Sequence, residues 1–385
     1  MIPISKPHLG PEEQEAVLRP LKSGWLMQGP EVAAFEKEFC AYTGAEHAVA
    51  VANGTAALHL ALKAVGVEAG HEVITVSHSY IATANSVRYL GAVPVFVDID
   101  PSDYNIESFL VERAITAKTS AILCVHQIGL PCNLARLREI ATRHGLRLVE
   151  DAACAAGSEI RLDGAWQKIG RPVGDAATFS FHPRKVLCTG DGGMVTTRDP
   201  EIARRCRAWR QHGMDVSGAA RHGSPKVVFE EHSEFGFNYR LSDLQAAVGR
   251  AQLARLPELV ARRRHLAAVY AEHLAAIPGL GLPREPEWAR TNWQSYCVRL
   301  PDGRDQREVM QAMLDRGVAT RRGVMCAHVE PPYRDHPGTW RVPEGQDLHY
   351  SEMALNRCLL LPMYHDLTDT EARQVCRTLS DVLGA

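Results

Sequence analysis

The sequence lacks a strong charge of either sign. Its 385 residues include 43 Lys and Arg against 45 Asp and Glu, which gives a formal net charge of −2. A near-neutral chain has no overall electrostatic attraction to nucleic acid or to an anionic membrane. No run approaches the roughly 18 uncharged apolar residues that indicate a membrane-spanning helix. We therefore expect no nucleic-acid partner and no membrane association.

Two further features are absent from the sequence. The N-terminal stretch MIPISKPHLGPEE has no basic region followed by an apolar core, so it predicts no secretory signal. The cysteines form no CxxC pair, which favours reduced thiols in a cytoplasmic protein and predicts no metal site, because a structural zinc site needs clustered ligands. The ten scattered cysteines are Cys40, Cys124, Cys132, Cys154, Cys188, Cys206, Cys297, Cys326, Cys358 and Cys376.

What is present is an alternation of helix-like and strand-like stretches over the first part of the chain. Such alternation predicts an α/β fold with a mostly parallel sheet covered by helices on both faces. The expected strands are 47–52, 72–76, 93–97, 120–125, 146–149, 176–181 and 193–197, and the expected helices between them are 11–23, 31–42, 55–65, 79–90, 106–114, 134–144 and 202–209.

The pattern changes in the last third, which predicts a smaller α/β domain at the C-terminus. Ordinary domain sizes place the division between residues 1–255 and 256–385. Around it we expect a loop at 221–233, two consecutive helices at 241–256 and 257–276, strands at 292–300 and 318–320, helices at 305–316 and 368–383, and a loop at 327–349.

The most informative stretch is TFSFHPRKVLCTGDGG, which contains Lys185. An apolar strand leads into it, and a glycine-rich turn that allows close backbone approach follows. A lysine that is partly buried loses proton affinity and serves as a nucleophilic amine, which is what a Schiff base to an aldehyde cofactor requires. The alternative is a surface lysine.

Three other stretches carry possible chemistry. Asp151 ends an apolar strand in LVEDAACAAG, where it acts either as a helix cap or turn residue, or as the carboxylate that keeps a pyridine nitrogen protonated. Gly54 and Thr55 lie in VANGTAA, a strand-to-helix turn whose free N–H groups suit a phosphate. Tyr80 in SHSYIATAN is either a core residue or a platform for a cofactor ring.

The order of these four stretches resembles that of fold-type I pyridoxal phosphate enzymes, and more narrowly the DegT–StrS family of sugar aminotransferases. The resemblance runs nearly end to end. It is carried by PHLGPEEQEAV and SGWLMQGPEVAAFEKEF at the start, FGFNYRLSDLQAAVGRAQL in the middle and LPMYHDLTDTEARQV at the close. It implies a large domain that binds pyridoxal 5′-phosphate and a smaller C-terminal domain.

The resemblance also implies roles for particular residues. Lys185 matches the lysine that forms the internal aldimine and shuttles a proton, and Asp151 matches the partner of the pyridinium nitrogen. Tyr80 falls where the family stacks an aromatic ring on the cofactor. The implied phosphate contacts are Gly54, Thr55, Ser180 and Asn238, of which Asn238 reaches the cofactor of a neighbouring subunit. The family resemblance therefore implies a homodimer with shared active sites.

Two positions depart from the family pattern. Many members have Gln or His where this chain has Cys154, near the ring hydroxyl of the cofactor, and a thiol is a poorer hydrogen-bond donor. Many members also have Glu where this chain has Asp191. A branch of the family replaces the lysine with histidine and catalyses dehydration, but Lys185 is present here, which favours transamination.

The implied reaction transfers an amino group from glutamate or glutamine to a keto-sugar, which we expect to be nucleotide-linked, by ping-pong chemistry. The alternatives are a dehydratase that uses the pyridoxal or pyridoxamine form of the cofactor, a cyclitol aminotransferase, and a non-catalytic regulatory member. The expected sugar contacts are Trp25, Gln28, His182, Arg321, His328 and Tyr333, for which a solvated surface position is the alternative.

Overall fold

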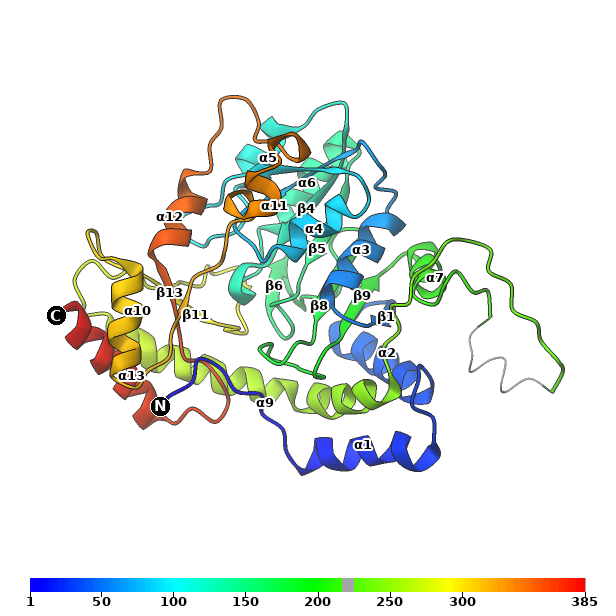
Figure 1. The fold of residues 1–385 in the computed structure, drawn as a ribbon, viewed down its shortest axis with the longest axis horizontal. Coiled ribbons are helices and arrows are strands. Elements are labelled where there is room, and N and C mark those ends of the chain that lie inside the picture. The colour runs from blue at the N-terminus through cyan, green and yellow to red at the C-terminus, as the bar shows by residue number, and fades with distance from the viewer. Residues whose placement is uncertain (217–224, 385) are drawn as a thin grey trace.

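The computed structural model describes residues 1–216 and 225–384, and a seven-stranded sheet lies at the centre of the larger part of the chain (Figure 1). The strand order is β1-β9-β8-β5-β4-β2-β3, and within this sheet only β9 runs against the other strands. The strands are β1 His47–Val51, β2 Glu72–Val76, β3 Val93–Val97, β4 Thr119–Val125, β5 Arg147–Asp151, β8 Ala176–Ser180 and β9 Gly193–Thr197. This confirms the predicted α/β class with a mostly parallel sheet.

Helices cover both faces of this sheet, as the alternation of side chains along each strand requires. In β1, Ala48 and Ala50 pack into one hydrophobic cluster, while Val49 and Val51 pack into another on the opposite face. The first cluster includes side chains from α2 Pro30–Thr43, α5 Ser108–Ala114 and α6 Leu134–His144; the second includes side chains from α3 Gly54–Ala64, α4 Ala82–Arg88 and α7 Pro200–Trp209.

The last third of the chain forms a separate cluster around a three-stranded antiparallel sheet of order β11-β13-β12. Its strands are β11 Tyr296–Arg299, β12 Arg321–Arg322 and β13 Cys358–Leu361, and its helices are α10 Gln306–Asp315 and α13 Asp369–Leu383. A further helix, α12 His349–Arg357, leads into β13, and its Ala354 packs into the first cluster of the large sheet. A second small sheet, β10-β6-β7, combines β6 Glu159–Leu162 and β7 Ala165–Lys168 with β10 Ala289–Arg290. Sequence patterns did not predict β6, β7, β10, β13 or α12.

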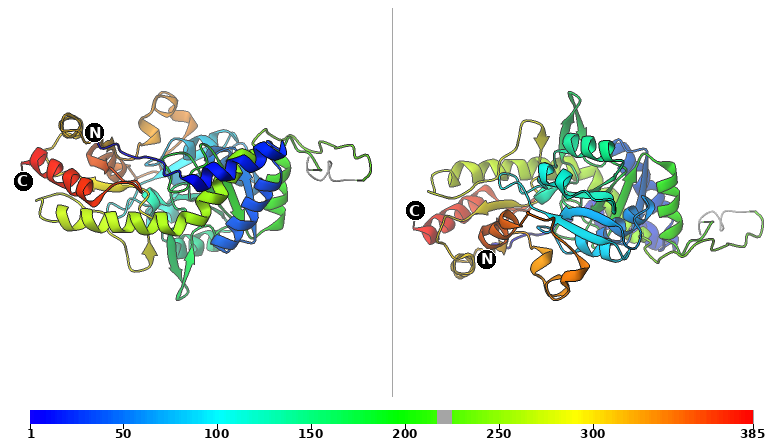
Figure 2. Two further views of the ribbon diagram at one scale, coloured as in Figure 1. Left: turned by 90° about the horizontal axis from the view of Figure 1, so that it is seen from below. Right: turned by 90° about the horizontal axis from the view of Figure 1, so that it is seen from above.

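One long helix, α9 Asp243–Leu274, replaces the two consecutive helices that the sequence predicted. Pro257 lies inside it, although an interior proline removes a hydrogen bond and costs about 3 kcal/mol. The helix packs on α1 Pro11–Ser23, α2 and α13, so tertiary contacts on both sides of Pro257 offset that cost (Figure 2). The predicted domain boundary at residues 255 and 256 falls inside this helix, and the division into two domains stays a proposal.

Three other sequence expectations need correction or restriction. The strand expected at 318–320 lies at Arg321–Arg322, and the expected loop at 327–349 contains α11 Pro331–Arg334 and two short 3₁₀ helices, Ala327–Val329 and Pro337–Thr339. A further 3₁₀ helix spans Gln127–Gly129. Of the loop expected at 221–233, residues 221–224 lie outside the described residues, and 225–233 form neither helix nor strand.

Among the helices of residues 1–216 and 225–384, none combines the length and apolar character that crossing a membrane requires.

Candidate active site

A cavity of about 470 Å³ lies at the carboxyl ends of the central parallel strands, and the C-terminal part of the chain closes one side. Ligands of open α/β sheets bind at this edge. Nine predicted site residues line the cavity, although they come from stretches far apart in the sequence: Gly54, Thr55, Tyr80, Asp151, Cys154, Ser180, His182, Lys185 and Arg321.

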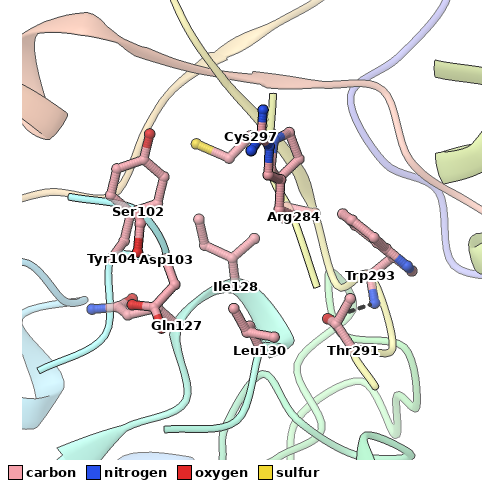
Figure 3. A pocket seen from close by; sticks show the side chains of 12 residues that line it. Ser102, Asp103, Tyr104, Gln127, Ile128, Leu130, Arg284, Thr291, Trp293 and Cys297 are labelled. Carbon is pink, nitrogen blue, oxygen red and sulfur yellow. Dashed lines mark hydrogen bonds between the residues drawn. The ribbon is translucent and has the colours of Figure 1, made fainter. Parts of the chain in front are cut away.

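A second, much smaller pocket lies beside this cavity and has a volume of about 30 Å³ (Figure 3). Tyr104, Arg284 and Trp293 are among the residues that surround it, and Gln127 and Ile128 line both the pocket and the cavity. A space of that size holds about one water molecule. The larger cavity is therefore the one that can accept a cofactor and a substrate.

The start of α3 forms one end of the cavity. Asn53 caps the helix, because its Oδ1 accepts a hydrogen bond from the Ala56 amide at 2.8 Å. Gly54 is required by close packing: a Cβ there would lie 2.7 Å from the Cβ of Ser180 on β8. The N–H groups of a first helical turn have no intrahelical partner and attract anions. The Gly54–Thr55 turn and Ser180 together thus form a site suited to a phosphate.

Asp151 ends β5 beneath the cavity and is buried. Its Oδ2 accepts a hydrogen bond from Thr83 Oγ1 at 2.8 Å, and its Oδ1 accepts one from the Ala153 amide at 3.1 Å. Burial raises the pKa of Asp151, while these bonds and nearby Lys185 act in the opposite direction. A buried carboxylate in this environment favours a cationic partner, such as a protonated ring nitrogen.

Lys185 lies in the turn between β8 and β9 and lines the same cavity as Asp151. Its Nζ is 2.9 Å from the Sγ of Cys154, so the thiol that departs from the family pattern contacts the predicted nucleophile. The turn is held from the C-terminal part of the chain, because the side chain of Gln294 bonds both the Val186 amide and the Arg184 carbonyl. The lysine is therefore positioned by two separate parts of the fold.

Tyr80 and His182 lie at the mouth of the cavity. Tyr80 is 62% exposed, which excludes the alternative that it is a core residue. His182 is also exposed; partial burial and then neighbouring Arg184 lower its pKa, which favours the neutral ring. Arg321 reaches the cavity from β12 and forms no ion pair with the described residues, whereas Arg322 pairs with Glu330 at 3.2 Å.

Five predicted site residues do not line the cavity. Tyr333 is buried and donates its hydroxyl hydrogen to Asn85 Oδ1 at 2.8 Å, and His328 contacts Ser77 Oγ at 2.6 Å, so both are engaged within the fold. The other three are Trp25, which bonds the Gln28 carbonyl; Gln28, which contacts Gln211; and Asn238, which is exposed.

Two residues that hold the site in place, Thr83 and Gln294, were not among the predicted site residues. Thr83 lies in the first turn of α4 and is buried beside Asp151, whereas Tyr80 precedes the helix and is exposed, so no helical spacing links the two. Gln294 lies within the strand expected at 292–300, but only the packing of the C-terminal part brings it to the lysine turn.

Comparison with known proteins supplies the remaining observation. Residues 7–380 match the model of the DegT/DnrJ/EryC1/StrS aminotransferase family. The chain belongs to this family. It is 36% identical to the spore coat polysaccharide biosynthesis protein SpsC of Bacillus subtilis (strain 168), over 99% of this chain and 97% of SpsC.

Solved structures agree with this assignment. DesV of S. venezuelae, solved in complex with a ketimine intermediate, is 38% identical, with a TM-score of 0.87 over 97% of this chain and 95% of that one. The PLP form of Spr1654 from Streptococcus pneumoniae is 25% identical, with a TM-score of 0.89 over 100% of this chain and 98% of that one. The protein is a pyridoxal-phosphate-dependent sugar aminotransferase with a fold-type I architecture.

The cavity fits this cofactor. Lys185 offers an amine, Asp151 offers a buried carboxylate, and the Gly54–Thr55 turn offers an anion site, all within one lining. The volume of about 470 Å³ is within the range of small-molecule sites and leaves room for a substrate beside the cofactor.

Proposed function

We propose that this enzyme transfers an amino group from glutamate or glutamine to a nucleotide-linked keto-sugar, by ping-pong chemistry in a cytoplasmic homodimer. The observation that supports this most directly is the grouping of Lys185, Asp151 and the Gly54–Thr55 turn around one cavity. Pyridoxal phosphate, when bound, supplies an aldehyde that accepts the amino group and a ring that delocalises the electron pair of the reacting carbon.

In this proposal each lining residue has one task. Lys185 Nζ would hold the cofactor covalently, and in each half reaction it would take a proton from one carbon and return it to another. Asp151 would keep the ring nitrogen protonated, and its bonds from Thr83 and Ala153 hold the carboxylate in place. Tyr80 would stack on the cofactor, and Gly54, Thr55 and Ser180 would bind its phosphate.

Nucleotide linkage is proposed because of the charge at the cavity wall. Arg321 lines the cavity without an ion-pair partner among the described residues, and a guanidinium group matches the geometry of phosphate oxygens. Asn238 lies outside the cavity of its own chain and is exposed, in keeping with a contact to a neighbouring subunit. Trp25, Gln28, His328 and Tyr333 are not placed at the cavity by a single chain, and their predicted sugar contacts stay predictions.

The test follows the absorption of the bound cofactor. Purified protein is expected to be yellow, and borohydride is expected to trap the cofactor on Lys185, as peptide mass spectrometry would show. Glutamate or glutamine alone should bleach the visible absorption band of the bound cofactor. A nucleotide keto-sugar added next should restore the band, and the mass of the sugar product should show a new amino group. A protein that gains no visible band with added pyridoxal phosphate would contradict the assignment of these residues.

The same assay separates the alternative reactions. A dehydratase would leave its sugar product without a new amino group, and a cyclitol aminotransferase would aminate a free cyclitol instead of a nucleotide keto-sugar. A regulatory member would bind the cofactor without turnover. An Arg321→Ala variant is expected to raise the KM for a nucleotide-linked acceptor at least tenfold, while the first half reaction with the amino donor changes little.

A further inference from the structure

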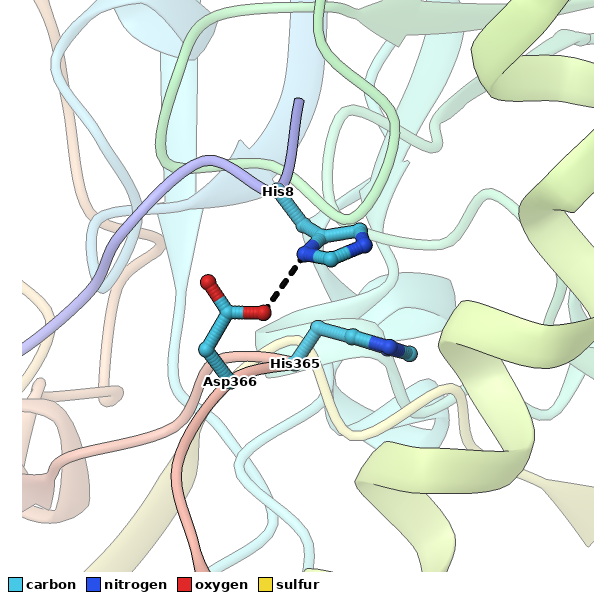
Figure 4. Close-up of side chains that lie close together, drawn as sticks. All are labelled: His8, His365 and Asp366. Atoms are coloured by element: carbon cyan, nitrogen blue, oxygen red, sulfur yellow. Dashed lines mark hydrogen bonds and ion pairs between the residues drawn. The ribbon is translucent and has the colours of Figure 1, made fainter. Parts of the chain in front are cut away.

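Three side chains with metal-binding atoms meet where the two ends of the chain come together. His8 belongs to the N-terminal segment before α1, and His365 and Asp366 lie between β13 and α13 (Figure 4). Each residue offers one ligand atom, and these atoms all lie within 4.8 Å of one another. His8 Nδ1 lies 2.6 Å from Asp366 Oδ1, and the two imidazole rings have centroids 4.1 Å apart.

The backbone of this cluster is held in place by α9. Gln252 Nε2 donates to the His8 carbonyl at 2.9 Å, and Arg262 Nε donates to the His365 carbonyl at 3.4 Å. The side chains of His8, His365 and Asp366 are 25%, 19% and 37% exposed, which leaves the cluster accessible to an ion from solvent. The three groups are therefore preorganised by the fold and remain open at the surface.

One nitrogen atom of the cluster has no hydrogen-bond partner among the described residues and could bind an ion. His365 Nδ1 is buried and has no hydrogen-bond partner in the described part of the chain. Lys6 Nζ lies 3.5 Å from Asp366 Oδ2, on the carboxylate oxygen that does not contact His8.

We propose that His8, His365 and Asp366 form a binding site for a divalent transition-metal ion of the zinc class. Two imidazoles and a carboxylate suit zinc, nickel or cobalt, whereas calcium and magnesium prefer all-oxygen sets. Ligands at about 2.0–2.2 Å around one tetrahedral ion lie about 3.4 Å apart. The ligand atoms here lie within 4.8 Å of one another, so the widest pair needs to close by at most about 1.4 Å, and the His8–Asp366 pair at 2.6 Å needs to open by about 0.8 Å. The ion replaces the proton between His8 Nδ1 and Asp366 Oδ1.

A carboxylate lies beside the other nitrogen of the His365 ring. Glu258 extends from α9, and its Oε1 lies 3.5 Å from His365 Nε2. With the ion on Nδ1, Glu258 would accept a hydrogen bond from Nε2 and orient the ring, so the site would join the N-terminal segment, the segment after β13 and α9. Close to it, the Met363 amide donates to the Ile4 carbonyl at 3.1 Å, and both residues line the active-site cavity. The ion would stiffen this wall of the cavity, and the proposal does not depend on which substrate the cavity binds.

The test uses tag-free holoenzyme that has been treated with a chelator and dialysed. Titration with Co²⁺ and Zn²⁺ is expected to show one site per chain, with cobalt absorption bands that lack thiolate charge-transfer intensity and a higher melting temperature with metal. His8→Ala and Asp366→Asn are expected to weaken binding at least tenfold. Mg²⁺ should give no effect at the same concentration.

The matched control is His265→Ala. His265 Nε2 pairs with Asp369 Oδ2 at 2.8 Å, a similar histidine–carboxylate contact that lacks a second histidine. This variant should bind metal as tightly as the wild type. Should His8→Ala fail to fold, Asp366→Asn keeps the side-chain volume and gives the same comparison. Metal affinity that is unchanged in the folded His8 and Asp366 variants, or cobalt spectra dominated by sulfur ligation, would overturn the proposal.

Discussion

Lys185 Nζ and Cys154 Sγ lie 2.9 Å apart, although 31 positions separate them in the chain. Cys154 follows the end of β5, and Lys185 lies in the turn after β8, the strand that pairs with β5. Neighbouring parallel strands thus bring the thiol and the amine to one edge of the sheet. Because a thiol is a weak hydrogen-bonding group, this contact contributes little energy, but it identifies Cys154 as a neighbour of Lys185.

Alkylation should reveal this position. Cys40 and Cys154 are the partly exposed cysteines of the described chain, and the other eight are buried. We expect iodoacetamide to modify Cys154 in cofactor-free protein and pyridoxal phosphate to protect it at least tenfold. Peptide mass spectrometry measures both sites, and Cys40 serves as the internal control because the cofactor should leave its rate unchanged. Equal protection of both cysteines would instead indicate a global change in the fold.

Replacing Asp151 by Asn should test the role of the buried carboxylate. The amide keeps the shape of the side chain but removes the charge that favours a protonated ring nitrogen. We expect the rate of the half reaction with the amino donor to fall by about 10²–10⁴, the usual range for a proton-handling group. Stopped-flow absorbance of the bound cofactor measures this rate.

Thr83→Val is the companion variant to Asp151→Asn. It removes one hydrogen bond to the carboxylate and leaves the charge in place. A bond to a charged group is worth about 1.5–3 kcal/mol, so we expect a fall of roughly tenfold to a hundredfold. If Thr83→Val lowers the rate of the half reaction more than Asp151→Asn does, the Asp151 carboxylate is not the group on which that rate depends.

His59 should make the fold sensitive to mild acid. Burial lowers the pKa of His59 to about 4, with Lys63 acting in the same direction. An unfolded histidine titrates near about 6.5, so the unfolded state binds more protons as the pH falls from about 6.5 to about 4. The stability that depends on a neutral His59 is therefore fully present above about pH 6.5. As the pH falls from about 6.5 to about 4, the free energy of unfolding decreases by on the order of 1–3 kcal/mol.

Denaturant unfolding at several pH values measures this loss. His59→Gln should flatten the fall in stability between about pH 6.5 and 4. The exposed His273 provides the control, because its replacement by Gln should leave the pH dependence as in the wild type. Parallel curves for the wild type and His59→Gln would show that His59 is not responsible.

Asp243 should contribute to stability by joining two helices. Its carboxylate, buried at the start of α9, accepts hydrogen bonds from the amides of Gly29, Glu31 and Val32 at the start of α2. Asp243→Asn replaces one acceptor oxygen with a donor that faces these amides. We expect unfolding free energy to fall by about 1–3 kcal/mol in denaturant titrations.

The control for Asp243→Asn is the same substitution at Asp199. There one side-chain oxygen accepts both capping bonds of α7, from Glu201 and Ile202, and Asn caps helices about as well as Asp. Asp199→Asn should therefore change stability by less than about 0.5 kcal/mol. Similar losses of unfolding free energy at both positions would show that the hydrogen bonds of Asp243 stabilise the fold no more than an ordinary helix cap.

Local sequence patterns predicted much of this fold. The helices at 11–23 and 134–144 and the strand at 193–197 lie where the patterns placed them, because caps, glycines and apolar periodicity act within a few residues. The pattern failed at Pro257, where contacts with other helices override a local breaker. It also failed for β6, β7 and β10, which have two to four residues and exist only because each has a partner strand.

The sequence by itself determined the family, and it predicted roles for Lys185 and Asp151 from the motifs of neighbouring residues in which they lie. Tertiary structure alone decided which distant groups meet. It brought Cys154 to Lys185, Gln294 to the lysine turn, and His8 to Asp366 across 358 positions. Absence of clustered ligands in the sequence therefore did not exclude a ligand cluster, since hydrophobic burial of whole elements, not sequence distance, brings such side chains together.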